Sequence, residues 1–453
     1  MWKPTLDDDA ETLTGQLLGA MRRDIRAGVL EPGSRLPTHR DLAHRLGVGV
    51  GTVTAAYAQA VQQGLIEARV GRGSFVLAAS SAEGDVILSY NVPPLEPAAR
   101  YMATALKTLR NRRDLHDALN YVPAAGLEAY RRAGAAWLKR RCAYTLADPA
   151  RMIVTCGAQQ ATALVLAALA KPGEIILTEA ATFFGVKTLA HHAGYKLEGL
   201  AMDGEGLLPQ ALDRAAASGK ARFLYTLPTL QNPTGRIMSE QRRADIAKVA
   251  RKRKLWIIED DTFGGFATGN APPPLATFAP ERTIYIGGMS KILAPGLRTA
   301  YLQTPDDDMQ EKIGQAIRAT SLSLGGIGHL IASQWIEDGT ADEIAEAVTG
   351  EIRMRNTLVR RKLDRLLEPE ADRRCPHLWL PMPELDAERL TARAQRQGVQ
   401  LTPPDAPIVN PALISGVRLC VGGDLSEVQL ESAIAVVADA LTAGREERSL
   451  TLV

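Results

Sequence analysis

The alternation of apolar and polar residues predicts three short helices and a hairpin before residue 77. The first helix carries an apolar stripe at every fourth position, formed by Leu13, Leu17, Met21 and Ile25. The second helix can be capped by Thr38 and ends at Gly47, and the third begins near Gly49 and ends at Gly64. Two short runs on either side of Gly71-Arg72-Gly73 predict a β-hairpin. This is the element order of a winged helix-turn-helix.

The pattern changes after residues 78–85, a small and polar stretch that we interpret as a linker. In the body that follows, over residues 86–445, β-rich runs alternate with helical stretches. The runs lie at residues 152–155, 174–177, 223–225, 255–258 and 283–286. This alternation predicts an α/β body with a mainly parallel sheet covered on both faces. We expect its large part at about 120–310 and a smaller C-terminal α/β subdomain at about 371–445.

Composition indicates an ordinary globular chain with one basic segment. Of its 453 residues, 46% are apolar and 23% are charged, and the net charge is +2. Residues 22–76 hold eight arginines against four acidic residues, which suits a phosphate-rich partner, although a solvated face explains such an excess equally well. The first residues lack the apolar core of a signal peptide and no apolar stretch could span a bilayer, so we expect a cytoplasmic protein without membrane contact. Four scattered cysteines without CxxC spacing suggest neither a zinc cluster nor a disulfide framework.

Three carboxylates, Glu259, Asp260 and Asp261, follow the apolar run at residues 255–258. Because ligands of open α/β sheets gather at the carboxyl ends of strands, a metal, an acid/base pair or a counter-charge for a cationic ring would each suit this place. Adjacent residues of a strand point to opposite faces, so the three acids cannot converge on one ion, and no histidine is close in sequence. We therefore expect no metal site.

Lys291 follows small residues after the run at 283–286. Most lysines are solvated surface residues, but desolvation at a strand end can lower the pKa of an amine enough for it to form a Schiff base. Ser290 and Arg298 flank this lysine. Upstream, Ala158 and Gln159 open a helix after Gly157, where free backbone amides can bind a phosphate.

Three further strand-end residues complete a pattern. Asn232 offers an amide donor, Phe183 an aromatic face for a flat ring, and Asp260 a carboxylate for a ring nitrogen. A phosphate, a stacking face, a ring nitrogen that needs a carboxylate and a carbonyl that needs a lysine together describe pyridoxal 5′-phosphate.

The stretch GVLEPGSRLPTHRDLAHRLGVGVGTVTAAYAQAVQQGLIEARVGRGSFV, residues 28–76, closely resembles the GntR-type winged helix-turn-helix DNA-binding domain. The resemblance implies DNA contacts by Thr38 and Arg40 at the second helix, Thr52 and Thr54 on the recognition helix, and Arg69 and Arg72 in the wing. Gly49-Val50 departs from the family, in which many members carry Ser-Arg before Gly-Thr-Val. An arginine commonly used on DNA is therefore missing.

The motifs NPTG, EDD and SK…PGLR resemble the fold-type I, aspartate-aminotransferase-like proteins. The resemblance implies that Lys291 forms the internal aldimine with pyridoxal phosphate, that Asp260 pairs with the pyridine nitrogen and that Asn232 donates to the phenolic oxygen. It further implies that Phe183 stacks on the ring and that the phosphate is held by Ala158, Gln159, Ser290 and Arg298. Arg418, in GVRL, matches the arginine that grips a substrate carboxylate. Tyr121 matches a position that reaches the site across a dimer, and Asn91 matches a position near the site.

A GntR-like head joined by a short linker to an aminotransferase-like body resembles the MocR/GabR-type transcriptional regulators from end to end. The resemblance implies a head-to-tail homodimer that binds a double-stranded DNA operator with two half-sites. It also implies that the body senses a small amino compound through an external aldimine at Lys291. Two alternatives remain open: an active aminotransferase, or a sensor of pyridoxal phosphate that controls vitamin B6 metabolism.

Two departures bear on this choice. In aminotransferase-like proteins a tyrosine usually follows the ring-nitrogen aspartate, and here Thr262 and Phe263 stand in that place. Phe263 can keep the packing but has no hydroxyl for the phenolic oxygen, so we expect a raised aldimine pKa. Gly288 stands where a serine or threonine often assists the phosphate. We expect cofactor binding to survive both changes.

Overall fold

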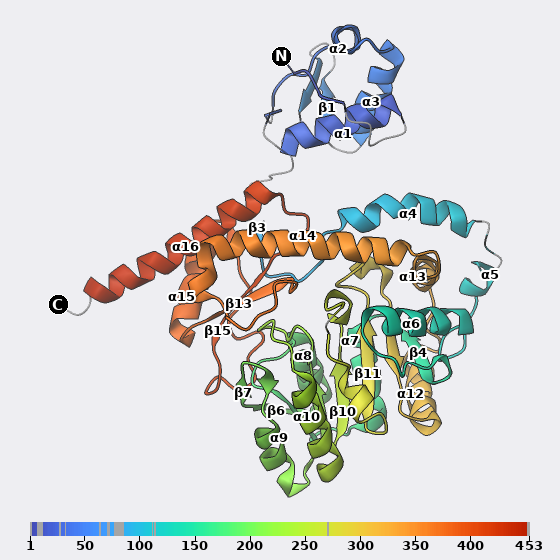
Figure 1. Ribbon diagram of the computed structural model, residues 1–453, viewed down its shortest axis with the longest axis vertical. Coiled ribbons are helices and arrows are strands. Elements are labelled where there is room, and N and C mark those ends of the chain that lie inside the picture. Colours follow the sequence, from blue (N-terminus) through green and yellow to red (C-terminus); the bar gives the residue numbers. More distant parts are fainter. Residues whose placement is uncertain are drawn as a thin grey trace. The chain divides into compact units, whose positions relative to one another are not determined.

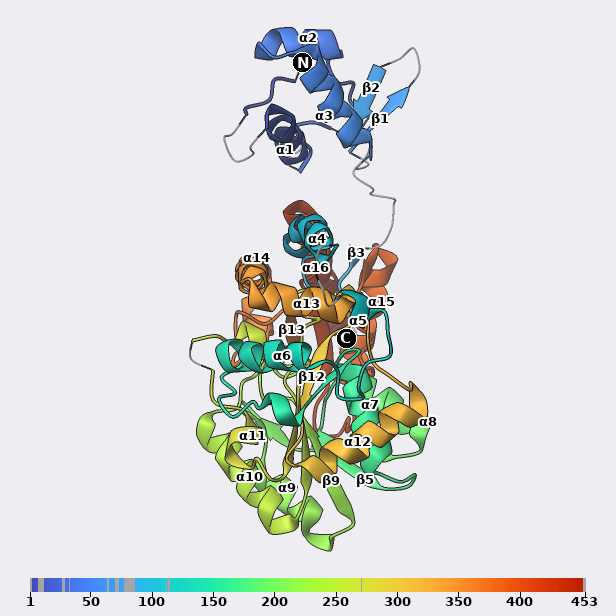
Figure 2. The same cartoon turned by 90° about the vertical axis from the view of Figure 1, so that its right-hand side faces the viewer.

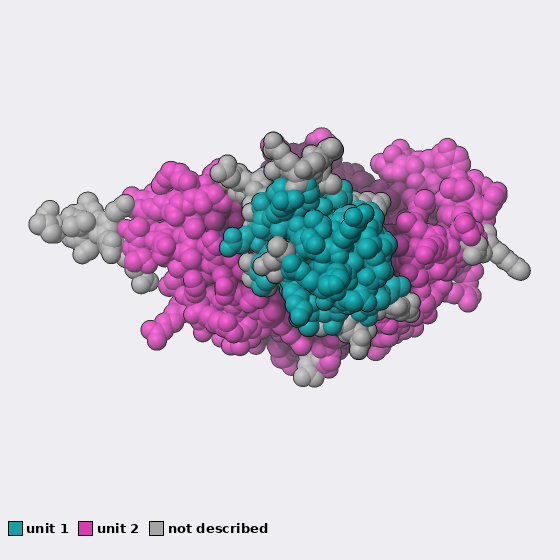
Figure 3. All heavy atoms as spheres, turned by 90° about the horizontal axis from the view of Figure 1, so that it is seen from above, with its two compact units in different colours: residues 1–84 teal, residues 85–453 magenta. Residues whose placement is uncertain are grey.

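The computed structural model divides the chain into two compact units, Met1–Gly84 and Asp85–Val453, which are coloured separately in Figure 3. The structure describes residues 2–6, 12–26, 29–31, 33–62, 65–69, 73–76, 86–110, 112, 115–269 and 271–450. The predicted linker at 78–85 and Arg72 lie outside these residues, and only the backbone of Arg69 is described.

The first unit is the predicted winged helix-turn-helix. It contains α1 (Leu13–Arg26), α2 (His39–Leu46), α3 (Val50–Gln62) and the antiparallel strands β1 (Ile66–Arg69) and β2 (Gly73–Val76). The side chain of Thr38 caps α2 by accepting a hydrogen bond from the backbone N–H of Asp41 at 3.2 Å. Gly47 ends α2 in the left-handed conformation, with φ 67°, which glycine adopts without steric cost. Of the apolar stripe predicted for α1, Leu17 and Met21 are buried in the core of this unit and Ile25 packs against it, whereas Leu13 is exposed.

The second unit is built on a seven-stranded sheet in the order β4-β12-β11-β10-β9-β5-β6 (Figure 1). The strands are β4 (Met152–Thr155), β5 (Ile175–Glu179), β6 (Lys196–Leu200), β9 (Ala221–Thr226), β10 (Trp256–Asp260), β11 (Thr283–Gly288) and β12 (Ala300–Gln303). β12 runs antiparallel to both of its neighbours, and the other pairs are parallel. The prediction of a mainly parallel sheet is confirmed.

Helices cover both faces of this sheet, as Figures 1 and 2 show. They are α6 (Glu128–Arg141), α7 (Ala158–Leu169), α8 (Phe184–Ala193), α9 (Pro209–Ala215), α10 (Glu240–Arg253), α11 (Leu275–Phe278) and α12 (Asp307–Thr320). Ile257 and Ile258 of β10 are both fully buried but belong to different core clusters. A central strand buried on both faces favours a continuous apolar run, and residues 255–258 form one before Glu259 and Asp260 end the strand.

The smaller C-terminal subdomain packs near the carboxyl ends of several strands of the sheet. Helix α13 (Ile327–Glu337) packs on α6, and the long helix α14 (Thr340–Leu363) leads into the subdomain. The subdomain contains β13 (His377–Pro381), α15 (Glu384–Arg396), β14 (Val399–Gln400), β15 (Gly416–Cys420) and α16 (Glu427–Leu450). Near the start of the unit, β3 (Val86–Ile87) pairs in parallel with β14, and α4 (Glu96–Leu109) contacts α13 and α14. The short helix α5 (Leu115–Ala118) and the hairpin β7 (Met202–Asp203) and β8 (Gly206–Leu207) complete the unit.

Among the described residues, no helix combines the length and the apolar character that crossing a membrane requires.

Candidate functional site

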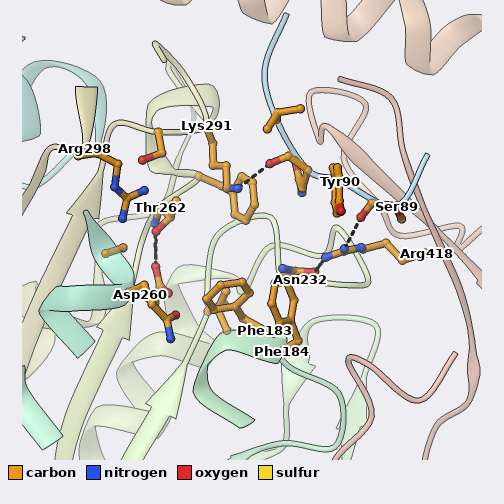
Figure 4. A pocket seen from close by; sticks show the side chains of 17 residues that line it. Ser89, Tyr90, Phe183, Phe184, Asn232, Asp260, Thr262, Lys291, Arg298 and Arg418 are labelled. Atoms are coloured by element: carbon orange, nitrogen blue, oxygen red, sulfur yellow. Dashed lines mark hydrogen bonds between the residues drawn. The ribbon is translucent and has the colours of Figure 1, made fainter. Parts of the chain in front are cut away.

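A cavity of about 270 Å³ lies in the second unit where the ends of β10 and β11 meet the subdomain (Figure 4). Every residue predicted to bind the cofactor or the carboxylate lines it. These are Ala158, Gln159, Phe183, Asn232, Asp260, Ser290, Lys291, Arg298 and Arg418. Asn91 lines it as well, but Tyr121 does not, and its side chain is 77% exposed. The structure of one chain therefore brings together all of the proposed cofactor residues, and the cross-dimer role of Tyr121 stays a prediction.

Lys291 follows the carboxyl end of β11, and its Nζ donates a hydrogen bond to the backbone oxygen of Asn91 at 2.5 Å. Burial lowers the pKa of Lys291 to about 8, and the nearby guanidinium groups of Arg418 and Arg298 act in the same direction. Cys420 and Asp260 oppose this shift. About one tenth of the amine is therefore uncharged and nucleophilic at pH 7, far more than for a lysine of ordinary pKa.

Asp260 ends β10 and is almost fully buried. Its carboxylate accepts hydrogen bonds from the hydroxyl of Tyr225 at 2.6 Å and from the hydroxyl of Thr262 at 2.5 Å. Burial raises the pKa of Asp260, while the bonds from Thr262 and Tyr225 lower it again. Both hydroxyl groups therefore hold the carboxylate in place and favour its ionised form, the form that pairs with a protonated ring nitrogen.

The two neighbouring acids point away from this cavity. The Glu259 carboxylate accepts from the backbone N–H groups of Leu275 and Ala276, at 2.8 and 2.9 Å. Asp261 accepts from the hydroxyl of Tyr285 at 2.6 Å. Burial raises the pKa of Glu259 to about 8 and that of Asp261 to about 6. Within the described part of the chain, no group of three or more His, Cys, Asp or Glu residues could hold a metal ion.

The part of the cavity at the start of α7 is suited to a phosphate. Gly157, with φ 93°, precedes α7, so the first backbone amides of the helix are available at Ala158 and Gln159. Arg298, with φ 47°, turns its guanidinium toward this helix end and donates from Nη2 to the backbone oxygen of Cys156 at 2.9 Å. A Cβ atom at Gly157 would lie 2.8 Å from that Nη2. Only glycine therefore lets the arginine approach the helix end this closely.

Arg418 comes from β15 and is buried, with three polar partners. It donates to Oδ1 of Asn232 at 2.9 Å, to the backbone oxygen of Ser89 at 3.0 Å and to the hydroxyl of Thr402 at 3.2 Å. The bond to Oδ1 fixes the orientation of the Asn232 amide, so its Nδ2 group is left to donate elsewhere. Two N–H groups of the guanidinium also remain for a ligand, because a guanidinium carries five.

Several lining residues were not found from the sequence. The segment after β3 contributes Ser89, Tyr90 and Val92, Phe184 begins α8, and Leu227 follows β9. These positions carry no motif of their own. Tyr225, which binds Asp260 but does not line the cavity, was also missed. A tyrosine inside a buried strand needs a hydrogen-bond partner, so the strand-end acids were an available signal for it.

In the first unit, the candidate DNA contacts lie on α2 and α3. Arg40 and Thr54 are exposed and Thr52 is half-buried, while the Thr38 hydroxyl forms the cap of α2. Arg72 lies outside the described residues, as does the side chain of Arg69.

Comparison with known protein families gives two matches. Residues 83–437 match the aminotransferase class I and II family, and residues 13–76 match the gntR family of bacterial regulatory proteins. The first match spans more than half of the chain, and the two together reproduce the head and the body.

Individual relatives include both an HTH-type regulator and aminotransferases. The chain is 30% identical over 372 residues to YdeF, an uncharacterised HTH-type transcriptional regulator of Bacillus subtilis, covering 80% of this chain and 79% of the relative. It is 28% identical over 321 residues to 2-aminoadipate transaminase of Thermus thermophilus, covering 69% and 78%. Among solved structures, the Thermus thermophilus α-aminoadipate aminotransferase LysN, complexed with N-(5'-phosphopyridoxyl)-L-leucine, superposes with a TM-score of 0.69 at 24% identity, over 88% of this chain and 100% of that one.

The cofactor that this family implies is pyridoxal phosphate, and the lining of the cavity fits it. The buried Asp260 carboxylate suits a ring nitrogen, the end of α7 with Arg298 suits a phosphate, and Lys291 supplies an amine of lowered pKa. The chain belongs to the family of transcriptional regulators that join a GntR-type winged helix-turn-helix to an aminotransferase class I and II domain, the MocR/GabR type.

Proposed function

We propose that this regulator senses a small amino compound in the cavity around Lys291 and converts its binding into a change in DNA affinity. One observation carries the proposal: a single chain joins a DNA-binding head to a body in which an amine of lowered pKa, a buried carboxylate and a helix end converge on one cavity. Pyridoxal phosphate bound there supplies an aldehyde that combines reversibly with primary amines.

The proposal gives each lining residue a role toward the bound cofactor. Asp260 would hold the ring nitrogen protonated, Asn232 would donate from Nδ2 to the phenolic oxygen, and Phe183 would pack on the ring. The amides of Ala158 and Gln159, with Ser290 and Arg298, hold the phosphate. Arg418 binds the carboxylate of the amino compound with its remaining N–H groups, so the effector class is an amine that also carries an acidic group.

The proposed assembly is a head-to-tail homodimer on an operator with two half-sites. Tyr121 and Leu119 are 77% and 73% exposed, which is unusual for large apolar side chains close together in sequence and favours an interface. A two-fold dimer presents two heads, and two heads require two half-sites.

A transaminase remains the second candidate, because Lys291, Asp260, Asn232 and Arg418 all line the cavity as a catalyst would need. Steady turnover of an amino donor with a keto acid would favour this candidate. The hydroxyl missing at Phe263 favours the sensor, since the bound cofactor would lack a hydrogen bond to its phenolic oxygen that related catalysts supply.

The test is selection of operators from a random duplex library by the full-length protein loaded with pyridoxal phosphate. The proposal expects a common sequence with two half-sites whose affinity changes when an amino acid effector is added. Binding without any sequence preference would refute it. A response to pyridoxal phosphate alone, with none to any amine, would instead indicate a sensor of the vitamer.

A further inference from the structure

The outward face of helix α3 contains no cationic side chain. Neither lysine nor arginine occurs anywhere between Gly47 and Gly64. The inner face of the helix, Val53, Ala56, Tyr57 and Ala60, is buried in the core of the first unit. The exposed face is formed mainly by small, uncharged residues: Val50, Gly51, Thr54, Ala55, Ala58 and Gln59. Among the described side chains, this face offers mainly methyl groups and the carboxamide of Gln59, with the half-buried hydroxyl of Thr52 beside them.

The hydroxyl of Thr54 is already engaged inside the protein. It donates to the backbone oxygen of Val50 at 2.9 Å, and it lies 3.1 Å from Nδ1 of His39 on α2. Because the only hydroxyl proton goes to Val50, the histidine nitrogen has to be the donor of the second bond. Thr54 therefore has no hydroxyl proton left for a base, and its methyl group becomes its main contribution. Gln59 is then the exposed α3 side chain, among those described, with a full set of amide donors and acceptors for a base edge.

These side-chain groups differ in the base edges that they can contact. Guanine is read most often by arginine or lysine, which bind its O6 and N7 acceptors, whereas glutamine pairs with adenine and small apolar groups contact the thymine methyl. Since α3 has no cation but has the methyl groups of Thr54, Ala55 and Ala58, its chemistry matches A·T pairs. A Cβ atom added at Gly51 would meet nothing within 4 Å, so the start of the helix is open to close approach.

We propose that α3 reads A·T base pairs in the major groove, an inference that rests on the proposed DNA-binding function. It does so through thymine methyl groups packed on Thr54, Ala55 and Ala58, and through an adenine held by Gln59, without a guanine-reading contact. The cations needed for phosphates come from α2, where Arg40 and Arg45 are exposed. Phosphate contacts add affinity but carry no sequence information. In this proposal α3 therefore reads the bases and α2 binds the phosphates.

Base analogues in the selected operator test this inference on the full-length, cofactor-loaded protein. Replacing a contacted thymine by uracil removes one methyl group and should weaken binding about fourfold, since burial of one such group contributes about that factor. Replacing guanine by 7-deazaguanine removes the N7 acceptor and should leave affinity unchanged. Loss of affinity with 7-deazaguanine, together with tolerance of uracil, would overturn the proposal.

Protein variants provide the complementary test. Gln59→Ala should relax discrimination at one A·T pair by about tenfold, while Val61→Ala, at the C-terminal end of α3, should leave the selected sequence unchanged. Val50→Arg should add a preference for guanine at one position. Gln59→Ala with unaltered preference at every position would contradict the assignment. If no operator is selected at all, the regulatory function itself has failed, an outcome distinct from an operator read through guanine.

Discussion

Arg418 donates a hydrogen bond to Oδ1 of Asn232 at 2.9 Å, from a strand of the small subdomain to the loop that follows β9. The proposed carboxylate-binding residue and the proposed donor to the phenolic oxygen of the cofactor are thus in direct contact. A ligand that draws the Arg418 guanidinium toward its own carboxylate will pull on the Asn232 amide. We therefore expect the binding of an effector to alter the hydrogen bonding of Asn232, and with it the electronic state of a bound cofactor.

Arg418→Lys removes the planar fork but keeps the charge. Hydrogen bonds to charged groups contribute about 1.5–3 kcal/mol, so affinity for a carboxylate-bearing amino compound should fall about 10- to 100-fold. Titration of the cofactor absorbance with amino acids measures this, and Arg389→Lys, at an exposed arginine of α15, is the matched control. Equal affinity of both variants for the amino compound would show that Arg418 does not bind its carboxylate.

Thr262→Val keeps the shape of the side chain but removes the hydroxyl that donates to Asp260. The hydrogen bond from Thr262 lowers the pKa of Asp260, which burial raises, so the pKa should rise when this bond is lost. Less of the carboxylate is then ionised to pair with the ring nitrogen. We expect affinity for pyridoxal phosphate to fall about tenfold, measured by equilibrium dialysis. Thr262→Ser retains the hydroxyl and should bind the cofactor as the unmodified protein does, and an equal loss in both would point to packing instead.

Phe263→Tyr restores the hydroxyl that related catalysts carry. A new hydrogen bond to the phenolic oxygen should lower the pH midpoint of the cofactor's absorbance change by about one to two units. The ring of Phe263 lies 5.1 Å from that of His377, so the variant also needs a stability check by thermal unfolding. A folded variant with an unshifted midpoint would show that position 263 does not face the phenolic oxygen.

The pH dependence of cofactor loading reports on Lys291. Its pKa, lowered to about 8, means that the neutral amine increases with pH up to that value and then levels off. The rate at which apoprotein captures pyridoxal phosphate should therefore rise about tenfold per pH unit below 8 and flatten above it. Stopped-flow absorbance, corrected with a free amine as reference, measures this rate. A rate that still rises steeply beyond pH 9.5 would indicate an ordinary solvated lysine.

Local sequence patterns were sufficient for much of the site. Asp260 ends a buried strand, Lys291 and Asn232 each follow one, and parallel strands bring such positions to one edge of the sheet. The capping of α2 by Thr38 and its end at Gly47 were equally local and are confirmed.

Long-range contacts could not be predicted in the same way. The hydroxyl of Tyr225 reaches Asp260 only because β9 and β10 are neighbours, and the backbone of Ser89 reaches Arg418 across 329 residues. The sheet also gains β6 and β12, which the alternation of residues did not reveal. β6 is only partly buried, and β12 is four residues long and pairs antiparallel between β4 and β11.

The central claim is that an amino compound bound at Lys291 changes DNA binding by the head. Operator affinity should be measured by fluorescence anisotropy with full-length protein, with and without the amino acid that shifts the cofactor absorbance, and repeated with Lys291→Ala. The account predicts an effector-dependent change in affinity that disappears in Lys291→Ala while sequence-specific binding itself remains. An unchanged effector response in Lys291→Ala, or no response in the unmodified protein to any amine that shifts the absorbance, would contradict it.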